Sequence, residues 1–116
     1  MAILRTPEGK RLYDEYQRNP EFTGTCVLCS VPALKNYKHW KIVKNSFPYD
    51  RIAKVHDMLL PLRHTNEEEL TLEELEELKN IKKEILNSDY EFILEATNKR
   101  KSIPAHFHLH LIIVKE

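Results

Sequence analysis

The fold is decided near the end of the printed chain, in the stretch His106-Phe107-His108-Leu109-His110-Leu111-Ile112-Ile113-Val114. Its histidines recur at every second position, and a spacing of two is that of a β-strand. In a strand the imidazoles share one face at steps of about 6.6 Å, and the apolar residues between them pack into a core. A helix would scatter the same side chains by roughly 100° per residue. The row of histidines therefore predicts an extended segment over residues 106–114.

Length and composition favour a single domain without a strongly charged partner surface. The 116 residues are enough to bury a core without disulfides. The 18 basic residues balance the 18 acidic ones, which argues against a nucleic acid or a membrane surface as partner. No apolar stretch approaches the roughly 20 residues of a membrane span, and residues 1–10 lack the apolar core of a signal peptide. We therefore expect a cytoplasmic protein.

Two helices are predicted from their start signals. The sequence Thr6-Pro7-Glu8 is typical of a helix start and predicts a short helix over residues 7–18. Thr71 and Glu74 form a capping-box pattern and predict the start of a longer helix. Its apolar residues repeat at helical spacing and are expected to form one buried face: Leu72, Leu75, Leu78, Ile81 and Ile85.

Strand-like segments lie on both sides of the longer helix in the sequence. Besides the histidine stretch they are residues 40–43, 53–62 and 90–96. Residues 21–37, which hold the two cysteines and Pro32, are predicted to be irregular. Short links between successive strands favour an α+β domain with an antiparallel sheet.

Several uses of the histidines and cysteines are open on the residues alone. One histidine in a strand is ordinarily a partly exposed residue with no shared task. His106 and His108 can both reach one zinc ion, as in a metallohydrolase. A neutral imidazole that is held through its other nitrogen can instead attack a phosphorus centre and form a covalent phosphoramidate. Cys26 and Cys29 fit a metal site, a redox dithiol or two small buried residues.

The histidine stretch and two upstream blocks resemble the histidine triad, or HIT, superfamily. The upstream blocks are Asn45-Ser46-Phe47-Pro48-Tyr49-Asp50 and His56-Asp57-Met58-Leu59-Leu60-Pro61-Leu62-Arg63-His64. They are similar to the family's Asn-containing loop and to its strand that opens on a histidine and closes on Pro-x-x-His. The resemblance covers about residues 26–114. It implies a HIT domain at 21–116, with a HIT-like antiparallel sheet and one long helix, preceded by an N-terminal helical extension at 1–20.

The resemblance implies chemistry at the α-phosphate of a nucleotide conjugate. His108, the middle histidine, matches the family's nucleophile, and His110 and His56 match its supporting imidazoles. The implied substrates are nucleoside phosphoramidates, dinucleoside polyphosphates or nucleotide-sugar-type esters, which are hydrolysed or transferred through a nucleotidyl-histidine intermediate. Asn45 matches a ribose-contacting position, although an ordinary turn residue would give the same pattern. Many family members are two-fold dimers, so a homodimer is compatible with the resemblance.

The resemblance also implies a structural zinc ion. Bacterial HIT proteins and galactose-phosphate uridylyltransferases often bind zinc through an early Cys-x-x-Cys, the histidine of the Pro-x-x-His block and the first histidine of the triad. The matching residues are Cys26, Cys29, His64 and His106. Four such ligands close a tetrahedron without an open position for water. The metallohydrolase interpretation is weakened accordingly, because His106 would already be committed.

The chain departs from the family at the phosphate-binding loop. Many members have a glycine loop that ends in Gly-Gln-Ser, whereas this chain has Lys99-Arg100-Lys101-Ser102-Ile103-Pro104. Ser102, with a basic neighbour such as Lys101, would then have to bind the phosphates. Consecutive cations are equally typical of a solvated hairpin tip. The alternative function is therefore a catalytically weak nucleotide-binding or protein-interaction module.

Overall fold

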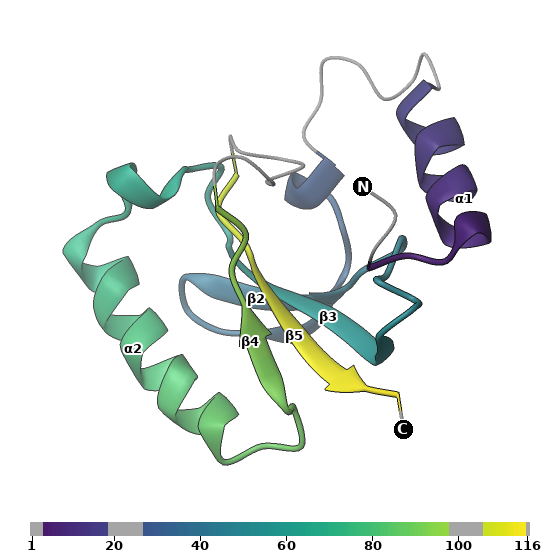
Figure 1. The fold of residues 1–116 in the computed structure, drawn as a ribbon. Coiled ribbons are helices and arrows are strands. Elements are labelled where there is room, and N and C mark those ends of the chain that lie inside the picture. Colours follow the sequence, from purple (N-terminus) through teal and green to yellow (C-terminus); the bar gives the residue numbers. More distant parts are fainter. Residues whose placement is uncertain (1–3, 19–26, 98–105, 116) are drawn as a thin grey trace.

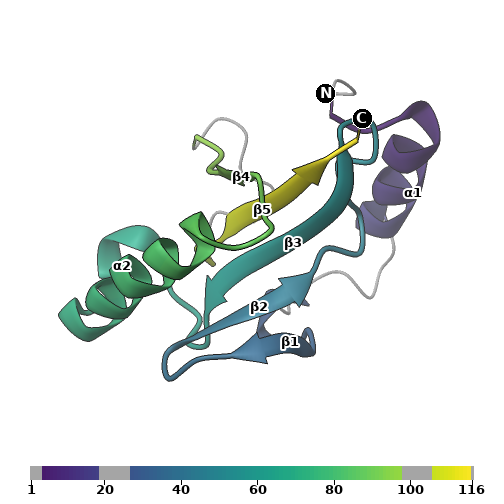
Figure 2. The same ribbon diagram turned by 90° about the horizontal axis from the view of Figure 1, so that it is seen from below.

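A five-stranded antiparallel sheet organises the computed structural model, which describes residues 4–18, 27–97 and 106–115 (Figure 1). The strands lie in the order β1-β2-β3-β5-β4, which Figure 2 shows clearly. Every neighbouring pair is antiparallel, so the predicted α+β class and sheet type are confirmed. The bounds are β1 (Ala33–Asn36), β2 (Trp40–Lys44), β3 (Ala53–Pro61), β4 (Phe92–Leu94) and β5 (Leu109–Val114).

Two of the strands differ from the expectation. β1 lies inside residues 21–37, which were predicted to be irregular, so that prediction was wrong for Ala33–Asn36. β1 is an edge strand with a register irregularity, and three of its four residues are exposed. Such a strand lacks the alternation of apolar and polar residues that reveals a half-buried strand. Part of the same segment forms the short 3-10 helix η2 (Val27–Cys29).

The histidine stretch enters the sheet later than its pattern predicts. The ladder of β5 begins at Leu109, so His110 is in the strand while His106 and His108 precede it. The reason is that the Phe107 N–H donates to the carbonyl oxygen of Thr65, at 2.8 Å, which ties this segment to the chain beyond β3. The alternation of sides is nevertheless retained. Phe107, with Leu109 and Leu111, packs in the core beneath the long helix.

The long helix α2 (Leu72–Leu86) starts where the capping box predicts it. Thr71 Oγ1 accepts the Glu74 N–H at 3.1 Å, and the Glu74 carboxylate accepts the Thr71 N–H at 2.8 Å. The predicted buried face is wrong in the first turn, because Leu72 is 85% and Leu75 43% exposed. Glu74 takes the buried position instead, where Arg63 pairs with its carboxylate at 2.7 Å.

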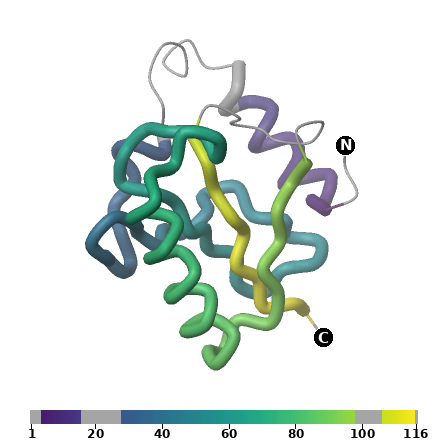
Figure 3. The backbone as a smooth tube through the Cα atoms, turned by 90° about the vertical axis from the view of Figure 1, so that its left-hand side faces the viewer, coloured from purple at the N-terminus to yellow at the C-terminus, as the bar shows by residue number. Residues whose placement is uncertain are grey.

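The core beneath α2 is formed by the helix and three strands. Figure 3 shows α2 running alongside the C-terminal part of the sheet. Burying these apolar side chains is the main stabilising contribution on this face. The buried members are Trp40, Ile42, Leu59, Leu70, Leu78, Ile81, Ile85, Phe107, Leu109 and Leu111.

The N-terminal helix α1 (Pro7–Arg18) confirms the helix predicted for these residues. Thr6 precedes it and caps it, because Thr6 Oγ1 accepts the Gly9 N–H at 3.1 Å. α1 and α2 lie at opposite ends of the molecule (Figures 1 and 2). Among the helices that the structure describes, none combines the length and the apolar character needed to cross a membrane.

Candidate functional site

A cluster of imidazoles lies on the face of the sheet opposite α2. His56 is on β3 and His110 is on β5. The register pairs Met58 with His110 and His56 with Ile112, so both histidines project from the same face of two adjacent strands. His106 and His108 join them from the segment before β5. All four histidines are buried, with exposures between 0% and 6%.

One backbone amide, that of Tyr49, determines which ring nitrogen of His56 and of His110 carries the proton. The Tyr49 N–H donates to His56 Nδ1 at 3.0 Å, so this nitrogen carries no proton. Neutral His56 is therefore protonated on Nε2, which lies 2.7 Å from His110 Nδ1 and donates to it. His110 in turn carries its proton on Nε2, which lies 3.4 Å from the Tyr49 hydroxyl oxygen. The pair thus has defined tautomers as well as defined ring positions.

Burial keeps this pair of imidazoles neutral. Desolvation lowers the pKa of His56 to about 4, with a smaller contribution from the positive charge of Arg5. Desolvation likewise lowers the pKa of His110 to about 3, and the neighbouring His56, His108 and Arg5 lower it further. At neutral pH both rings therefore act as neutral hydrogen-bonding groups.

His108 is held through one ring nitrogen. Its Nδ1 lies 3.0 Å from the carbonyl oxygen of His106. A carbonyl can only accept, so Nδ1 carries the proton and the lone pair of neutral His108 is on Nε2. The ring contacts that of His110 edge to face, with centroids 5.2 Å apart. This is the arrangement required of a nucleophilic imidazole.

A second cluster has the donor set of a metal site. The ring nitrogens His64 Nδ1 and His106 Nδ1 lie 3.3 and 3.5 Å from Cys29 Sγ. The three ligand atoms are within 4.8 Å of one another. His106 Nε2 donates to the Pro61 carbonyl at 3.0 Å, which leaves a lone pair on Nδ1. Tetrahedral zinc, with bonds of about 2.0–2.3 Å, spaces its ligands by roughly 3.5 Å, so these residues fit the ion.

The remaining predicted site residues have different outcomes. Cys26, Ser102 and Lys101 lie outside the described residues. Asn45 lies at the histidine cluster, with its amide nitrogen 3.3 Å from His56 Nε2. Its Oδ1 accepts the Phe47 N–H at 2.8 Å, which is the bond of an Asx turn. Asn45 therefore shapes its own loop.

Tyr49 is a site residue that the sequence analysis did not single out. Its ring centroid lies 4.6 Å from that of His56 and 5.0 Å from that of His110, and the side chain is buried. Its backbone N–H also sets the tautomers of the pair. The only sequence signal was its place in the Phe47-Pro48-Tyr49 loop, because no spacing rule connects a loop tyrosine with a distant strand.

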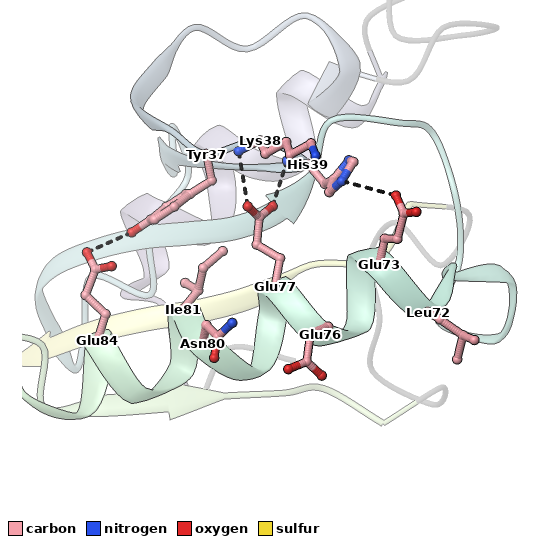
Figure 4. Close-up of a pocket in the computed structure, with 10 residues that line it drawn as sticks. All are labelled: Tyr37, Lys38, His39, Leu72, Glu73, Glu76, Glu77, Asn80, Ile81 and Glu84. Carbon is pink, nitrogen blue, oxygen red and sulfur yellow. Dashed lines mark hydrogen bonds and ion pairs between the residues drawn. The ribbon is translucent and has the colours of Figure 1, made fainter.

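A groove of about 660 Å³ lies elsewhere, between the β1–β2 turn and α2 (Figure 4). Its carboxylates mainly tie the turn to the helix. Glu77 accepts the N–H groups of Lys38 and His39, and Glu84 accepts the Tyr37 hydroxyl. An acidic lining repels phosphate, so we do not assign a nucleotide to this groove. The lining residues are Tyr37, Lys38, His39, Leu72, Glu73, Glu76, Glu77, Asn80, Ile81 and Glu84.

The face of the sheet opposite α2, which we call the histidine face, thus combines two kinds of chemistry. One cluster, around Cys29, offers ligand atoms for a metal ion. The other holds imidazoles of defined tautomer beside Tyr49. No protein-family model matches the chain, and no curated protein matches it either.

Proposed function

We propose that this chain is a HIT protein that hydrolyses or transfers the nucleotide of a nucleotide conjugate, with His108 as the nucleophile at the α-phosphate. The observation that carries the proposal is the hydrogen bond from His108 Nδ1 to the His106 carbonyl, at 3.0 Å. It directs the lone pair of the ring to Nε2 and orients the imidazole for attack. The sequence resemblance to the HIT signature supports the same assignment.

The proposed reaction has two displacements at phosphorus. His108 Nε2 forms a bond to the α-phosphorus while the bond to the leaving group breaks, and the leaving group keeps the electron pair and takes up a proton. The positive charge that develops on the ring is stabilised by the Nδ1–H bond to the His106 carbonyl. Water or an acceptor hydroxyl then attacks phosphorus and loses its proton. The N–P bond breaks, and the product is a nucleoside monophosphate or a new nucleotide conjugate.

The His56–His110 pair supports this reaction. The ring of His110 packs against that of His108 and limits its movement. The His110 Nε2–H is only loosely engaged by Tyr49, at 3.4 Å, and is the donor available to a phosphoryl oxygen. Ser102 and Lys101 remain the proposed phosphate contacts, and Asn45 the proposed ribose contact, of the same site.

We also propose a structural zinc ion. Cys29, His64 and His106 would hold it, with Cys26 as the fourth ligand. A bound zinc ion would supply a cross-link between the chain around η2, the end of β3 and the segment before β5. His106 carries the carbonyl that orients His108. Its fixed position therefore contributes to catalysis indirectly.

The nucleophile is tested by replacing His108 with alanine. Wild-type protein should turn over at least one of adenosine phosphoramidate, a dinucleoside tetraphosphate and a nucleotide sugar. In a rapid-quench experiment it should also form protein labelled at the α-phosphate. H108A should lose both turnover and label while it still folds and binds nucleotide. The half-exposed His39 lies outside the cluster, so H39A is the matched control and should keep full activity.

Three outcomes would separate this proposal from its rivals. Turnover by H108A at the wild-type rate would overturn the assignment of the nucleophile. Nucleotide binding by the wild type without turnover or label would favour the catalytically weak binding module. Activity that tracks the metal content and survives replacement of the cysteines would favour a metallohydrolase.

A further inference from the structure

The segment before α1 lies against the loop that carries Tyr49. Thr6 donates twice to the Asp50 carboxylate, through its N–H and its hydroxyl, each at 2.7 Å. The Arg51 N–H donates to the Leu4 carbonyl at 3.1 Å. The Arg5 Nε and Nη2 both donate to the Phe47 carbonyl, each at 3.1 Å. Residues 4–6 thus hold the loop on both sides of Tyr49.

Arg5 also contacts the ring of Tyr49. Its guanidinium carbon lies 4.9 Å from the ring centroid of Tyr49 and 4.2 Å from that of Tyr13. The Tyr49 ring also contacts the rings of His56 and His110. The side chain of Tyr49 therefore contacts both a guanidinium from the N-terminal segment and the two imidazoles of the site. Cation–π contacts of this kind are favourable when the ring is buried.

Gly9 indicates that the docking of α1 on this loop is close. A Cβ atom at position 9 would lie 2.5–2.8 Å from atoms of the Asp50 carboxylate. Only glycine permits this approach without displacing Asp50. Glycine is a poor helix former, and here it stands in the first turn of α1. The close contact gives a physical reason for its presence.

We infer that Arg5 is a positioning residue of the histidine site, which acts by holding the Phe47–Asp50 loop so that the Tyr49 N–H and ring orient the His56–His110 pair. The inference rests on the proposed function for its catalytic consequence, but its structural content is independent of it. Arg5 touches the Tyr49 ring and a loop carbonyl. Because its charge disfavours imidazolium nearby, Arg5 also helps to keep the pair neutral.

The experiment compares R5Q with R11Q. Arg11 is an exposed arginine on α1. Both of its described ion pairs are with residues of the same helix. Long-range ¹H–¹⁵N spectra report which imidazole nitrogen carries the proton. In the wild type and in R11Q, His56 and His110 should each show the Nε2–H tautomer. In R5Q both should shift towards a mixture of tautomers. The kcat should fall by roughly tenfold to a hundredfold with little change in KM.

Two further variants guard against a trivial loss of structure. R5K retains the charge but lacks the planar, two-donor geometry, so it should restore the tautomers only partly. G9A should also shift the tautomers of His56 and His110, although residue 9 does not touch them, because the added methyl group displaces Asp50 and with it the loop. Helix propensity alone predicts the opposite for G9A, namely a more stable α1 and an unchanged site.

The outcomes distinguish the inference from the proposed function. Unchanged tautomers in folded R5Q and G9A would overturn the positioning role, whatever the activity. Mixed tautomers in both variants, with R11Q unaffected, would support it even if H108A showed that the nucleophile had been misassigned. If R5Q fails to fold, the spectra of R5K decide the same question, and wild-type tautomers in folded R5K would then overturn the role of the Arg5 guanidinium.

Discussion

Both faces of the sheet bury apolar side chains, but only the face opposite α2 adds a network of buried imidazoles. The face beneath α2 is held by burial of apolar side chains, such as Leu109 and Leu111, which are at most 1% exposed. The opposite face also buries apolar side chains, such as Met58, Leu60 and Ile112. Its imidazoles are held in addition by directional bonds, each with a partner of fixed position. Burial scales with area and tolerates changes of shape. A tautomer instead depends on one donor or acceptor being in place.

The largest expected effect comes from the apolar face. L111A removes a fully buried side chain and leaves a cavity under α2. It should lower the free energy of unfolding by about 2–5 kcal/mol in urea titrations. Folded L111A should keep its imidazole tautomers, because no hydrogen bond of the histidine face is removed. The control is L72A on exposed α2 surface, expected within about 0.5 kcal/mol of the wild type. Equal effects of the two variants would contradict the comparison.

The second largest effect on stability is expected from removal of the metal, which acts on the histidine face. A chelator should lower the Tm of zinc-loaded wild type, by about 4–8 °C for each kcal/mol of binding free energy lost at the Tm. C29S, which lacks a donor of the cluster, should start from a lower Tm and respond little to the chelator. A melting curve that is identical with and without metal would reject the structural zinc site.

Acid should destabilise the histidine face more gradually. The pKa values of His56 and His110 are lowered to about 4 and about 3, against about 6.5 in an unfolded chain. Well above pH 6.5 both rings are neutral in either state, and their full contribution is present. As the pH falls from 6.5 towards 4, the unfolded chain binds protons that the folded one does not. Stability should then fall by up to about 1.4 kcal/mol per pH unit for each ring.

This pH dependence is measured by urea unfolding of metal-free protein between pH 7.5 and 5. H110Q removes one of the two rings, so its stability should fall less steeply than that of the wild type. Parallel curves for the two proteins would show that His110 binds a proton equally well in both states. The neutral buried pair would then be excluded.

Features set by neighbouring residues were predictable from the sequence. The starts of α1 and α2 follow from caps that act within a turn of the helix. The alternation around His108 likewise indicated an imidazole side and a core side. β1 was missed because an exposed edge strand is specified by its partner β2 rather than by its own pattern. The buried Glu74 was missed because its partner Arg63 comes from outside the helix.

The candidate site also has features that the sequence predicts and features that depend on distant partners. The sequence by itself determined which side chains are available: a row of imidazoles at strand spacing and thiols that suit a metal. The tertiary structure decided which nitrogen of His56, His106 and His110 carries a proton, whereas the partner of His108 is the nearby carbonyl of His106. The carbonyl of Pro61 and the amide of Tyr49 come from chain segments far from residues 106–110. The anchoring of Tyr49 by Arg5 spans a further long separation. Spacing encodes the local periodicity of the backbone, whereas protonation depends on contacts that exist only once the chain has folded.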